Sequence, residues 1–259
     1  MIRGRVVFFL LSIMAVLSPL AVVRNSDLTR TQIIATARLV LQSISSHGST
    51  LHYPNLALAE DGASVLASYN AAGSIYFSPH ADLSDGLILP NGIMDCQGSG
   101  NPLHPSVDLN RRWCFIGSKG QLGILLSVPG RITNISVSHP PQVSVLPSAP
   151  RHIILWGVVD GDANKAIYDE HGDVLQSLRA RLLVQGPFAR HDNWELIYVP
   201  LATFFYNIKG SSAHQVFDVF PEIHELRMDF GIVVVQIVNN WGEAYTGLHH
   251  VGIYGERVI

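Results

Sequence analysis

The histidines and carboxylates are the side chains of this chain that could perform acid–base or metal chemistry, and they form no known catalytic pattern. The sequence contains no G-x-S-x-G nucleophile elbow, no G-x-x-x-x-G-K-[ST] phosphate loop and no H-E-x-x-H zinc motif. His249 and His250 are adjacent, so on a strand they point to opposite faces and cannot bind one metal together. The carboxylates between Asp160 and Glu170 lack the spacing of a calcium loop, which favours a solvated turn. We therefore expect no catalytic residue, no metal and no cofactor, and a protein that binds.

The composition excludes several classes of partner and scaffold. The 259 residues carry a formal net charge of -3 without a basic block, whereas nucleic-acid binding needs a positive stripe that replaces phosphate counterions. We therefore expect no nucleic-acid partner. The two cysteines, Cys96 and Cys114, exclude a disulfide-rich scaffold and a four-cysteine zinc site. They leave open one disulfide or two separate thiols.

The N-terminus has the pattern of a membrane-targeting segment. Arg3 and Arg5 precede an apolar run over residues 6–23, which Arg24 closes. The run is near the lower length limit for a bilayer-spanning helix, and the same pattern describes a secretory signal peptide. Both interpretations place the rest of the chain in the lumen, because positive charge stays cytoplasmic. No strong small-x-small cleavage site follows, which favours a retained signal anchor over residues 1–24.

A short helix is predicted next, over residues 26–47. Ile34, Ala37, Leu41 and Ile44 lie on one seam of this helix. The seam either packs on its own domain or forms a coiled-coil stub, and two heptads are too few to decide.

From about Leu51 onward, short apolar runs alternate with Gly, Pro, Ser and Asn clusters, which is typical of an antiparallel sandwich or barrel. We predict strands over residues 123–128, 132–137, 152–156, 204–206 and 232–238, with turns at 160–162 and 209–212. Residues 161–195 are more charged and helix-permissive, so we interpret them as an insertion or long connection. Asn134-Ile135-Ser136 fits the N-glycosylation pattern, although a site inside a strand can stay unmodified.

Five segments, in order along the chain, resemble the motifs of the SUN domain, the lumenal module of proteins that bridge the nuclear envelope. They are Asn55–Val65 (NLALAEDGASV), Trp113–Gly120 (WCFIGSKG), Pro147–Arg151 (PSAPR), Phe204–Phe217 and Asn240–Thr246 (NWGEAYT). The match covers roughly residues 55–259. Many of these residues also have a structural explanation, since Trp113 and Phe115 share one face of a strand and fit a core.

The resemblance implies a fold, a partner and an assembly. The fold is an all-β antiparallel sandwich of the galactose-binding-like type, preceded by the short helix and the N-terminal membrane helix. The implied protein is a homotrimer, and its groove accepts the C-terminal tail of a KASH-like membrane protein by strand addition to a mobile hairpin. This hairpin, the lid, corresponds to roughly Ser68–Leu89.

Four positions correspond to peptide-binding residues of the family. The resemblance implies that Ser148 and Tyr245 hydrogen-bond the terminal carboxylate of the peptide and that His139 contacts the peptide in the groove. His249 replaces a second pocket tyrosine, and its imidazole can still donate to a carboxylate. Each of these residues could instead serve the fold alone.

Several departures from the family pattern limit what the resemblance implies. The cysteine that links to the partner falls near Asn70, and the cysteine pair of the cation loop falls near Arg112 and Gly247, so neither disulfide is expected. The segment 89–112 is longer than the usual cation loop, which places a bound cation in doubt. The short N-terminal part indicates a divergent, reduced member or a truncated gene model.

We therefore predict an adaptor with three parts, namely a signal anchor at 1–24, a short helix and linker at 25–54, and a SUN-like domain at 55–259 with the insertion at about 161–195. It would be a single-pass protein of the inner nuclear membrane or endoplasmic reticulum, with a lumenal C-terminus, and would link the nuclear envelope to the cytoskeleton. The alternatives are a secreted or lumenal carbohydrate-binding module and a protein-folding factor. A hydrolase is the least favoured, since loop carboxylates can converge in a fold.

Overall fold

The computed structural model describes residues 53–72, 87–89, 92–94, 101–105, 112–142, 146–182, 186–187 and 196–258, all within the unit that spans residues 38–259. The predicted signal anchor at 1–24 and the predicted helix at 26–47 lie outside these ranges. Within these ranges, no helix has both the length and the apolar character needed to cross a membrane.

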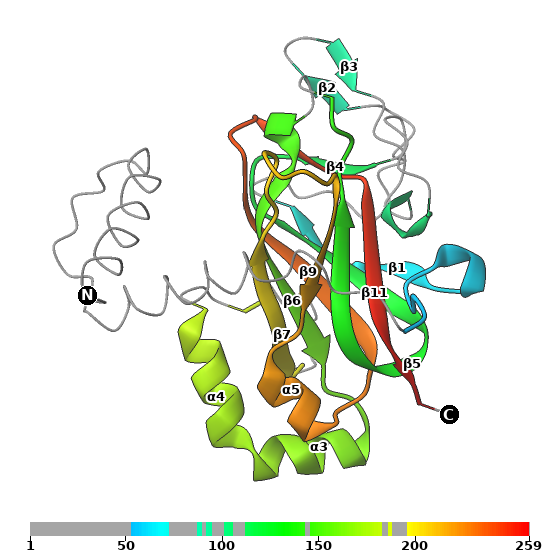
Figure 1. Cartoon of the computed structure of the whole chain (residues 1–259), viewed down its shortest axis with the longest axis vertical. Helices are drawn as coiled ribbons and strands as arrows, with labels where there is room; N and C mark the ends of the chain where they lie inside the picture. Colours follow the sequence, from blue (N-terminus) through cyan, green and yellow to red (C-terminus); the bar gives the residue numbers. More distant parts are fainter. Residues whose placement is uncertain are drawn as a thin grey trace, which may run out of the picture. The chain divides into compact units, whose positions relative to one another are not determined.

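One long strand, β5 (Gly120–Ser138), organises the sheets (Figure 1). Its first half pairs with β1 and β9, and its second half pairs with β11 and β8, in every case antiparallel. The sheet continues from β9 to β6 and then to β7. The bounds are β1 Ser64–Ala72, β6 Pro150–Val158, β7 Tyr198–Phe205, β8 His214–Asp218, β9 Phe230–Asn240 and β11 His250–Arg257.

A break in the register of β5 divides the strand between two layers. The pairing with β9 shifts between Leu125 and Gly130, and Pro129 in this stretch has no N–H group for a ladder hydrogen bond. Phe204 from β7 and Phe217 from β8 stack across the interior with ring centroids 4.1 Å apart. The described residues therefore form an antiparallel β-sandwich, as predicted. All five predicted strands lie within or overlap observed strands, and 123–128 and 132–137 belong to the single strand β5.

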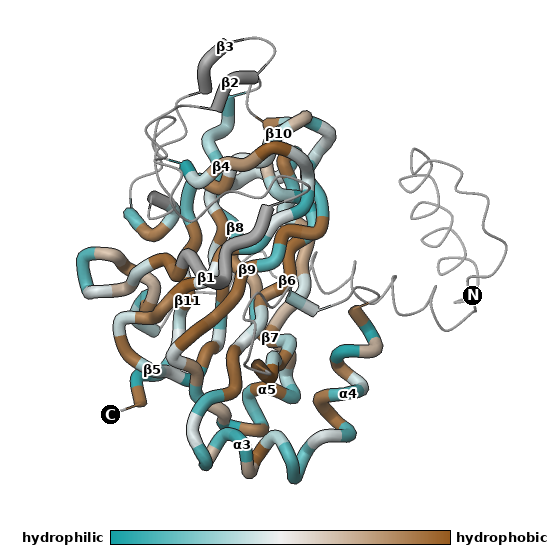
Figure 2. Tube along the Cα trace, turned by 180° about the vertical axis from the view of Figure 1, so that it is seen from behind, coloured by the Kyte–Doolittle hydropathy of each residue, from teal (hydrophilic) through white to brown (hydrophobic). Residues whose placement is uncertain are grey.

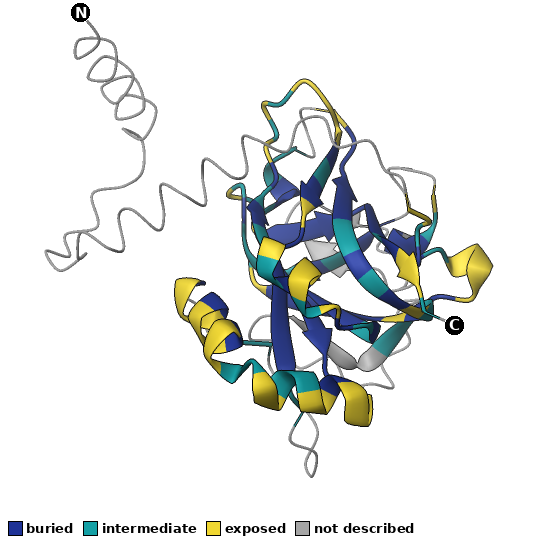
Figure 3. Ribbon diagram, turned by 60° about the horizontal axis from the view of Figure 1, so that its bottom comes forward, coloured by how far each residue is buried: buried dark blue, intermediate teal, exposed yellow. Residues whose placement is uncertain are grey.

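The core lies between the layers, and apolar side chains of the central strands fill it. Figure 2 shows hydrophobic residues concentrated along the strands, and Figure 3 shows that the same strands are buried. Val233, Val235 and Ile237 of β9 are almost completely buried, as are Ile135 and Val137 of β5. Trp113 and Phe115 are also buried, with ring centroids 4.8 Å apart, which confirms their predicted place in the core.

Within the described ranges, three α-helices make the fold mostly, but not purely, β. Between β6 and β7 lie α3 (Gly161–Glu170) and α4 (Gly172–Arg181), and α5 (Pro221–Leu226) follows β8. The predicted turn at 160–162 is wrong, because Asp160 caps α3 by accepting a hydrogen bond from the Gly161 amide at 2.8 Å. The buried leucines Leu175 and Leu178 of α4 join the core, and α4 packs against β7.

Short elements complete the end of the sandwich that carries the predicted site residues. Strand β4 (Trp113–Ile116) pairs antiparallel with β10 (Tyr245–Leu248), and the 3-10 helix η3 (Leu146–Ser148) precedes β6. Two further 3-10 helices are η1 (Ala59–Asp61) and η2 (Asn101–Leu103).

The segment expected to form the lid, residues 68–89, is described only at its ends. Residues 68–72 belong to β1, which pairs with β5, whereas β2 (Leu87–Leu89) pairs with β3 (Gly92–Met94). The described ends of the segment thus belong to separate sheets, and the remainder of the expected lid lies outside the described residues.

Candidate functional site

Gly247 on β10 marks a point where polar side chains from three segments converge. A Cβ atom at this position would lie 3.3 Å from Cδ of Arg112, 3.6 Å from Oγ of Ser148 and 3.9 Å from Nε2 of His249. A side chain at position 247 would crowd these groups, so the glycine lets all three approach β10 at this point. We call Arg112, Ser148, His249 and the adjoining His139 the Gly247 cluster.

Backbone pairing brings the three segments together. The register of β10 with β4 pairs Leu248 with Trp113, so Arg112 and His249 are the next residues beyond this pair. On the other side, η3 is tied to the turn between β9 and β10. The amide of Glu243 donates to the carbonyl of Pro147 at 3.3 Å, and the amide of Trp241 donates to that of Ala149 at 3.2 Å.

Asn240 holds the turn between β9 and β10 in shape. Its Nδ2 group donates to the carbonyls of Glu243 and Tyr245, both at 2.9 Å, and its Oδ1 atom accepts from the amide of Gly242 at 3.0 Å. Gly242 has a φ of 114°, in the left-handed region that favours glycine. Gly242 thus allows the turn, and the turn fixes where β10 begins.

His139, at the end of β5, extends the cluster toward Tyr206. Its ring centroid lies 4.6 Å from that of His249, at an interplanar angle of 90°, and 6.4 Å from that of Tyr206. The hydroxyl of Tyr206 donates to the carbonyl of Ala213 at 2.7 Å. Burial raises the pKa of Tyr206 to about 12, so the phenol stays protonated and keeps this hydrogen bond at physiological pH.

The cluster is enclosed by the fold. Ser148 and His249 are completely buried, His139 is 1% exposed and Arg112 is 7% exposed. Buried polar groups of this kind are stable only where hydrogen bonds or charges satisfy them. Such a set of donors is chemically suited to an anionic group, because guanidinium, hydroxyl and imidazole groups can all donate to carboxylate oxygens.

The four predicted peptide-binding residues lie at one end of the sandwich. Ser148 and His249 approach the same point, and His139 contacts His249. Tyr245 is two residues before Gly247 on β10, so its side chain leaves the strand on the same face as the cluster. Their roles in binding stay predictions.

Arg112 is the member that the sequence reasoning missed as a site residue. The available signal was the pair of positions, near Arg112 and Gly247, that the SUN family fills with bonded cysteines. A disulfide requires neighbouring Cα atoms, so the resemblance already implied that these two positions lie side by side. The structure places the Arg112 side chain against Gly247 in this way.

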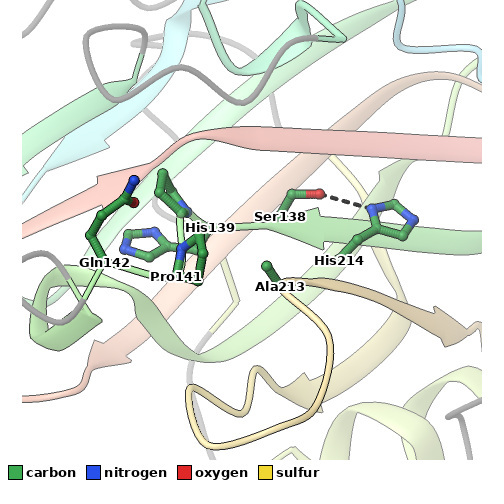
Figure 4. A pocket seen from close by; sticks show the side chains of 7 residues that line it. Ser138, His139, Pro141, Gln142, Ala213 and His214 are labelled. Carbon is green, nitrogen blue, oxygen red and sulfur yellow. Dashed lines mark hydrogen bonds between the residues drawn. The ribbon is translucent and has the colours of Figure 1, made fainter.

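An open pocket of about 220 Å³ adjoins the cluster at His139 (Figure 4). Its lining residues come from the end of β5 and the start of β8, and they are Ser138, His139, Pro140, Pro141, Gln142, Ala213 and His214. Ser138 Oγ and His214 Nδ1 are 2.8 Å apart and form a hydrogen bond in the pocket wall. The pocket thus combines an apolar, proline-rich surface with a few polar groups.

Two histidines flank Ser138 at this pocket. The register pairs Ser138 of β5 with His214 of β8 on one side and with His250 of β11 on the other. Burial, with the nearby His214 and His104, lowers the pKa of His250 to about 4, and burial also lowers the pKa of His214. Both rings are therefore neutral near pH 7.

The described part of the chain offers no group of three histidine, cysteine or acidic side chains that could hold a metal. Cys114 on β4 is disulfide-bonded. The other cysteine of the sequence, Cys96, lies outside the described residues.

No family model and no curated protein matches the chain. Solved structures with a similar backbone include the family 32 carbohydrate-binding module of Streptococcus pneumoniae EndoD, at a TM-score of 0.45 and 10% identity, covering 78% of this chain and 100% of that chain. Allantoicase gives 0.42 and 13%, covering 80% and 44%. The family 32 module of Clostridium perfringens NanJ, in complex with galactose, gives 0.39 and 8%, covering 74% and 98%. Identities this low concern the fold alone.

Proposed function

We propose that this protein is a non-enzymatic adaptor that binds the C-terminal tail of a KASH-like membrane protein and holds the terminal carboxylate at the Gly247 cluster. The observation that carries the proposal is the convergence of Arg112, Ser148 and His249 on one point, with His139 against them. Three of these residues are ones that the resemblance to SUN domains assigns to the peptide.

The chemistry of the cluster suits a chain end better than a mid-chain segment. A terminal carboxylate has two acceptor oxygens and a full negative charge, whereas a peptide carbonyl is neutral. Charge-assisted hydrogen bonds to a carboxylate are roughly twice as strong as neutral ones. In this proposal the tail approaches the cluster from the open pocket beside His139, the member that belongs to both.

The proposed membrane anchor, compartment and assembly are inferred from the sequence. In this proposal the apolar run at 6–23 anchors the chain in the nuclear envelope or endoplasmic reticulum membrane, the domain lies in the lumen, and the assembly is a homotrimer. The disulfide at Cys114 agrees with an oxidising compartment such as the lumen.

The test uses the full-length chain in detergent and an array of synthetic peptides, each prepared with a free and with an amidated C-terminus. We expect some peptides to bind only with a free carboxylate. The substitution Tyr245→Ala should weaken that binding. Equal binding of the free and amidated forms, or binding by neither, would contradict carboxylate capture.

A carbohydrate-binding module is the second candidate. The pocket beside His139 carries the Ser138 hydroxyl, the His214 imidazole and the Gln142 amide, and such groups hydrogen-bond to sugar hydroxyls. The same full-length protein applied to a glycan array distinguishes the two. Glycan binding that Gln142→Ala abolishes, without any peptide binding, would replace the adaptor proposal.

A further inference from the structure

We infer that Arg112 determines the ligand specificity of the Gly247 cluster, as the fixed positive charge that selects a terminal carboxylate over a neutral chain end. The inference rests on the proposed function and names a residue that the resemblance does not assign to the peptide. The SUN family has a disulfide cysteine near this position, so an arginine here changes the chemistry of the site.

The position of the side chain supports this role. Cδ of Arg112 lies 3.3 Å from the point where a Cβ of Gly247 would stand, and Oγ of Ser148 lies 3.6 Å from the same point. Nε of Arg112 follows Cδ by one bond and is buried. The Arg112 side chain therefore packs beside Ser148 and His249 where it passes Gly247.

The neighbouring strands fix the backbone from which the Arg112 side chain extends. Arg112 directly precedes β4, which pairs with β10 through four successive residues from Tyr245 to Leu248. Thr246 of β10 also donates its hydroxyl to the carbonyl of Gly117 at 2.7 Å, just beyond β4. Arg112 is also 7% exposed, and a side chain already restricted by burial loses less conformational freedom on binding, which favours affinity.

Arginine also differs from the other donors of the cluster in charge and geometry. Its guanidinium is charged at every physiological pH and can donate two parallel hydrogen bonds to a carboxylate. The hydroxyl of Ser148 and the imidazole of His249 can donate to a carboxylate or to a neutral amide. Among the four members of the cluster, only Arg112 thus carries a fixed charge that distinguishes an anionic from a neutral chain end at every physiological pH.

The experiment measures Kd for a peptide that the array selects, in its free and amidated forms, by fluorescence anisotropy with the full-length protein. The ratio of the Kd of the amidated peptide to the Kd of the free peptide reports recognition of the carboxylate, and a high ratio means strong recognition. We expect Arg112→Met to lower this ratio by about 10- to 100-fold, the usual range for a hydrogen bond to a charged group. Arg112→Lys should keep part of the ratio that Arg112→Met loses, because lysine retains the positive charge but cannot donate two parallel hydrogen bonds from a planar group.

Two further variants test whether the position of the Arg112 side chain matters and whether a nearby arginine outside the cluster has the same effect. Gly247→Ala keeps the arginine and forces its Cδ to shift, so the ratio should fall here as well. Arg151→Gln is the matched control, since Arg151 packs over the ring of Trp241, 4.7 Å from its centroid, and is not a member of the cluster. Its ratio should equal that of the wild-type protein.

The outcomes distinguish the inference from the proposed function. A wild-type ratio near one contradicts the proposed function, and the inference with it. A high wild-type ratio that Arg112→Met leaves unchanged, even if both peptides bind more weakly, assigns Arg112 a structural role and overturns the inference alone. A ratio that falls equally in Arg151→Gln would also overturn it, because any nearby charge would then suffice.

Discussion

At the scale of single residues, two strand glycines of this protein allow different neighbours to approach closely. At Gly247 the absent side chain lets polar groups from three segments approach the strand. At Gly157 on β6 the ring of Phe230 fills the space, with Cδ1 and Cε1 both 2.4 Å from where a Cβ would stand. One glycine therefore contributes to a candidate site, and the other contributes to core packing.

The substitution Gly157→Ala should destabilise the protein. Phe230 is 1% exposed, so its ring cannot move into solvent when the added methyl group displaces it. We expect the free energy of unfolding to fall by about 1–3 kcal/mol, the usual cost of overpacking a core. Urea denaturation measures this change. The control is Gly231→Ala on β9, where the nearest atom would be 3.9 Å away, and an equal loss there would contradict the packing argument.

Two histidines should make stability depend on pH. Burial lowers the pKa of His152 to about 4, with Arg151 adding to the shift, and burial with the neighbouring His214 and His104 lowers that of His250 to about 4. The unfolded chain, with a pKa near 6.5, binds more protons than the folded chain between these values. Stability is therefore complete above pH 6.5 and is lost as the pH falls toward 4.

We expect each of these histidines to contribute on the order of 3 kcal/mol to that loss. Urea midpoints measured across the interval should decline for the wild-type chain and decline less for His250→Asn. Replacement of the exposed His224 by asparagine should leave the decline unchanged. A His250→Asn profile parallel to that of the wild type would show that His250 does not cause it.

At the scale of elements, the helices α3 and α4 are attached to the sandwich by specific contacts. Asn164 of α3 donates to the carbonyl of Asp229 at 2.7 Å and accepts from the Asp229 amide at 3.3 Å. Arg179 of α4 packs near the ring of Trp156 and donates to the carbonyl of Tyr198 at 2.5 Å. These contacts join the helical segment to strands on both sides of it in sequence.

The substitution Leu178→Ala should therefore destabilise the whole domain and not the helices alone. Leu178 is completely buried, so the cavity left behind should cost about 2–5 kcal/mol. Val174→Ala on the same helix is the control, because Val174 is 39% exposed and its loss should have little effect. Unfolding followed by far-ultraviolet circular dichroism and by tryptophan fluorescence should shift together. Two separate transitions would show that α4 unfolds by itself.

At the scale of the whole molecule, β5 contributes to both layers of the sandwich, and the core between them is continuous. The stacked pair Phe204 and Phe217 joins β7 of one layer to β8 of the other. Because the same strand belongs to both layers, neither layer can lose its pairing with β5 without affecting the other. We expect the described domain to unfold as one cooperative unit.

The disulfide at Cys114 leads to a prediction about the intact chain. Alkylation of the unfolded, non-reduced protein should leave Cys114 unmodified, and alkylation after reduction should modify it. Mass spectrometry of the peptides identifies its partner. Reduction should also lower the melting temperature, because a disulfide restricts the unfolded chain. A Cys114 thiol that reacts before reduction would contradict the structure.

The sequence anticipated the candidate site only in part. Ser148, Tyr245, His139 and His249 were placed by motif resemblance, and the fold brings them to one end of the sandwich. Arg112 was recognised only as a departure from the family. Its proximity to Ser148 depends on three segments that are distant in sequence, and no local pattern reports such a contact.

The amino-acid sequence by itself indicated the sandwich and the strands β5, β6, β7 and β9, because strand formation depends in part on local chemistry, whereas the turn predicted at 160–162 is the start of α3. Apolar and β-branched side chains predicted β5, β6 and β9. Tertiary structure decided which distant segments come into contact, because the periodicity of a sequence carries no information on such contacts. The register of β4 with β10 and the docking of η3 bring Arg112, Ser148 and His249 to Gly247. These placements arise from long-range pairing and packing, whose free energy belongs to the assembled fold and not to any one segment.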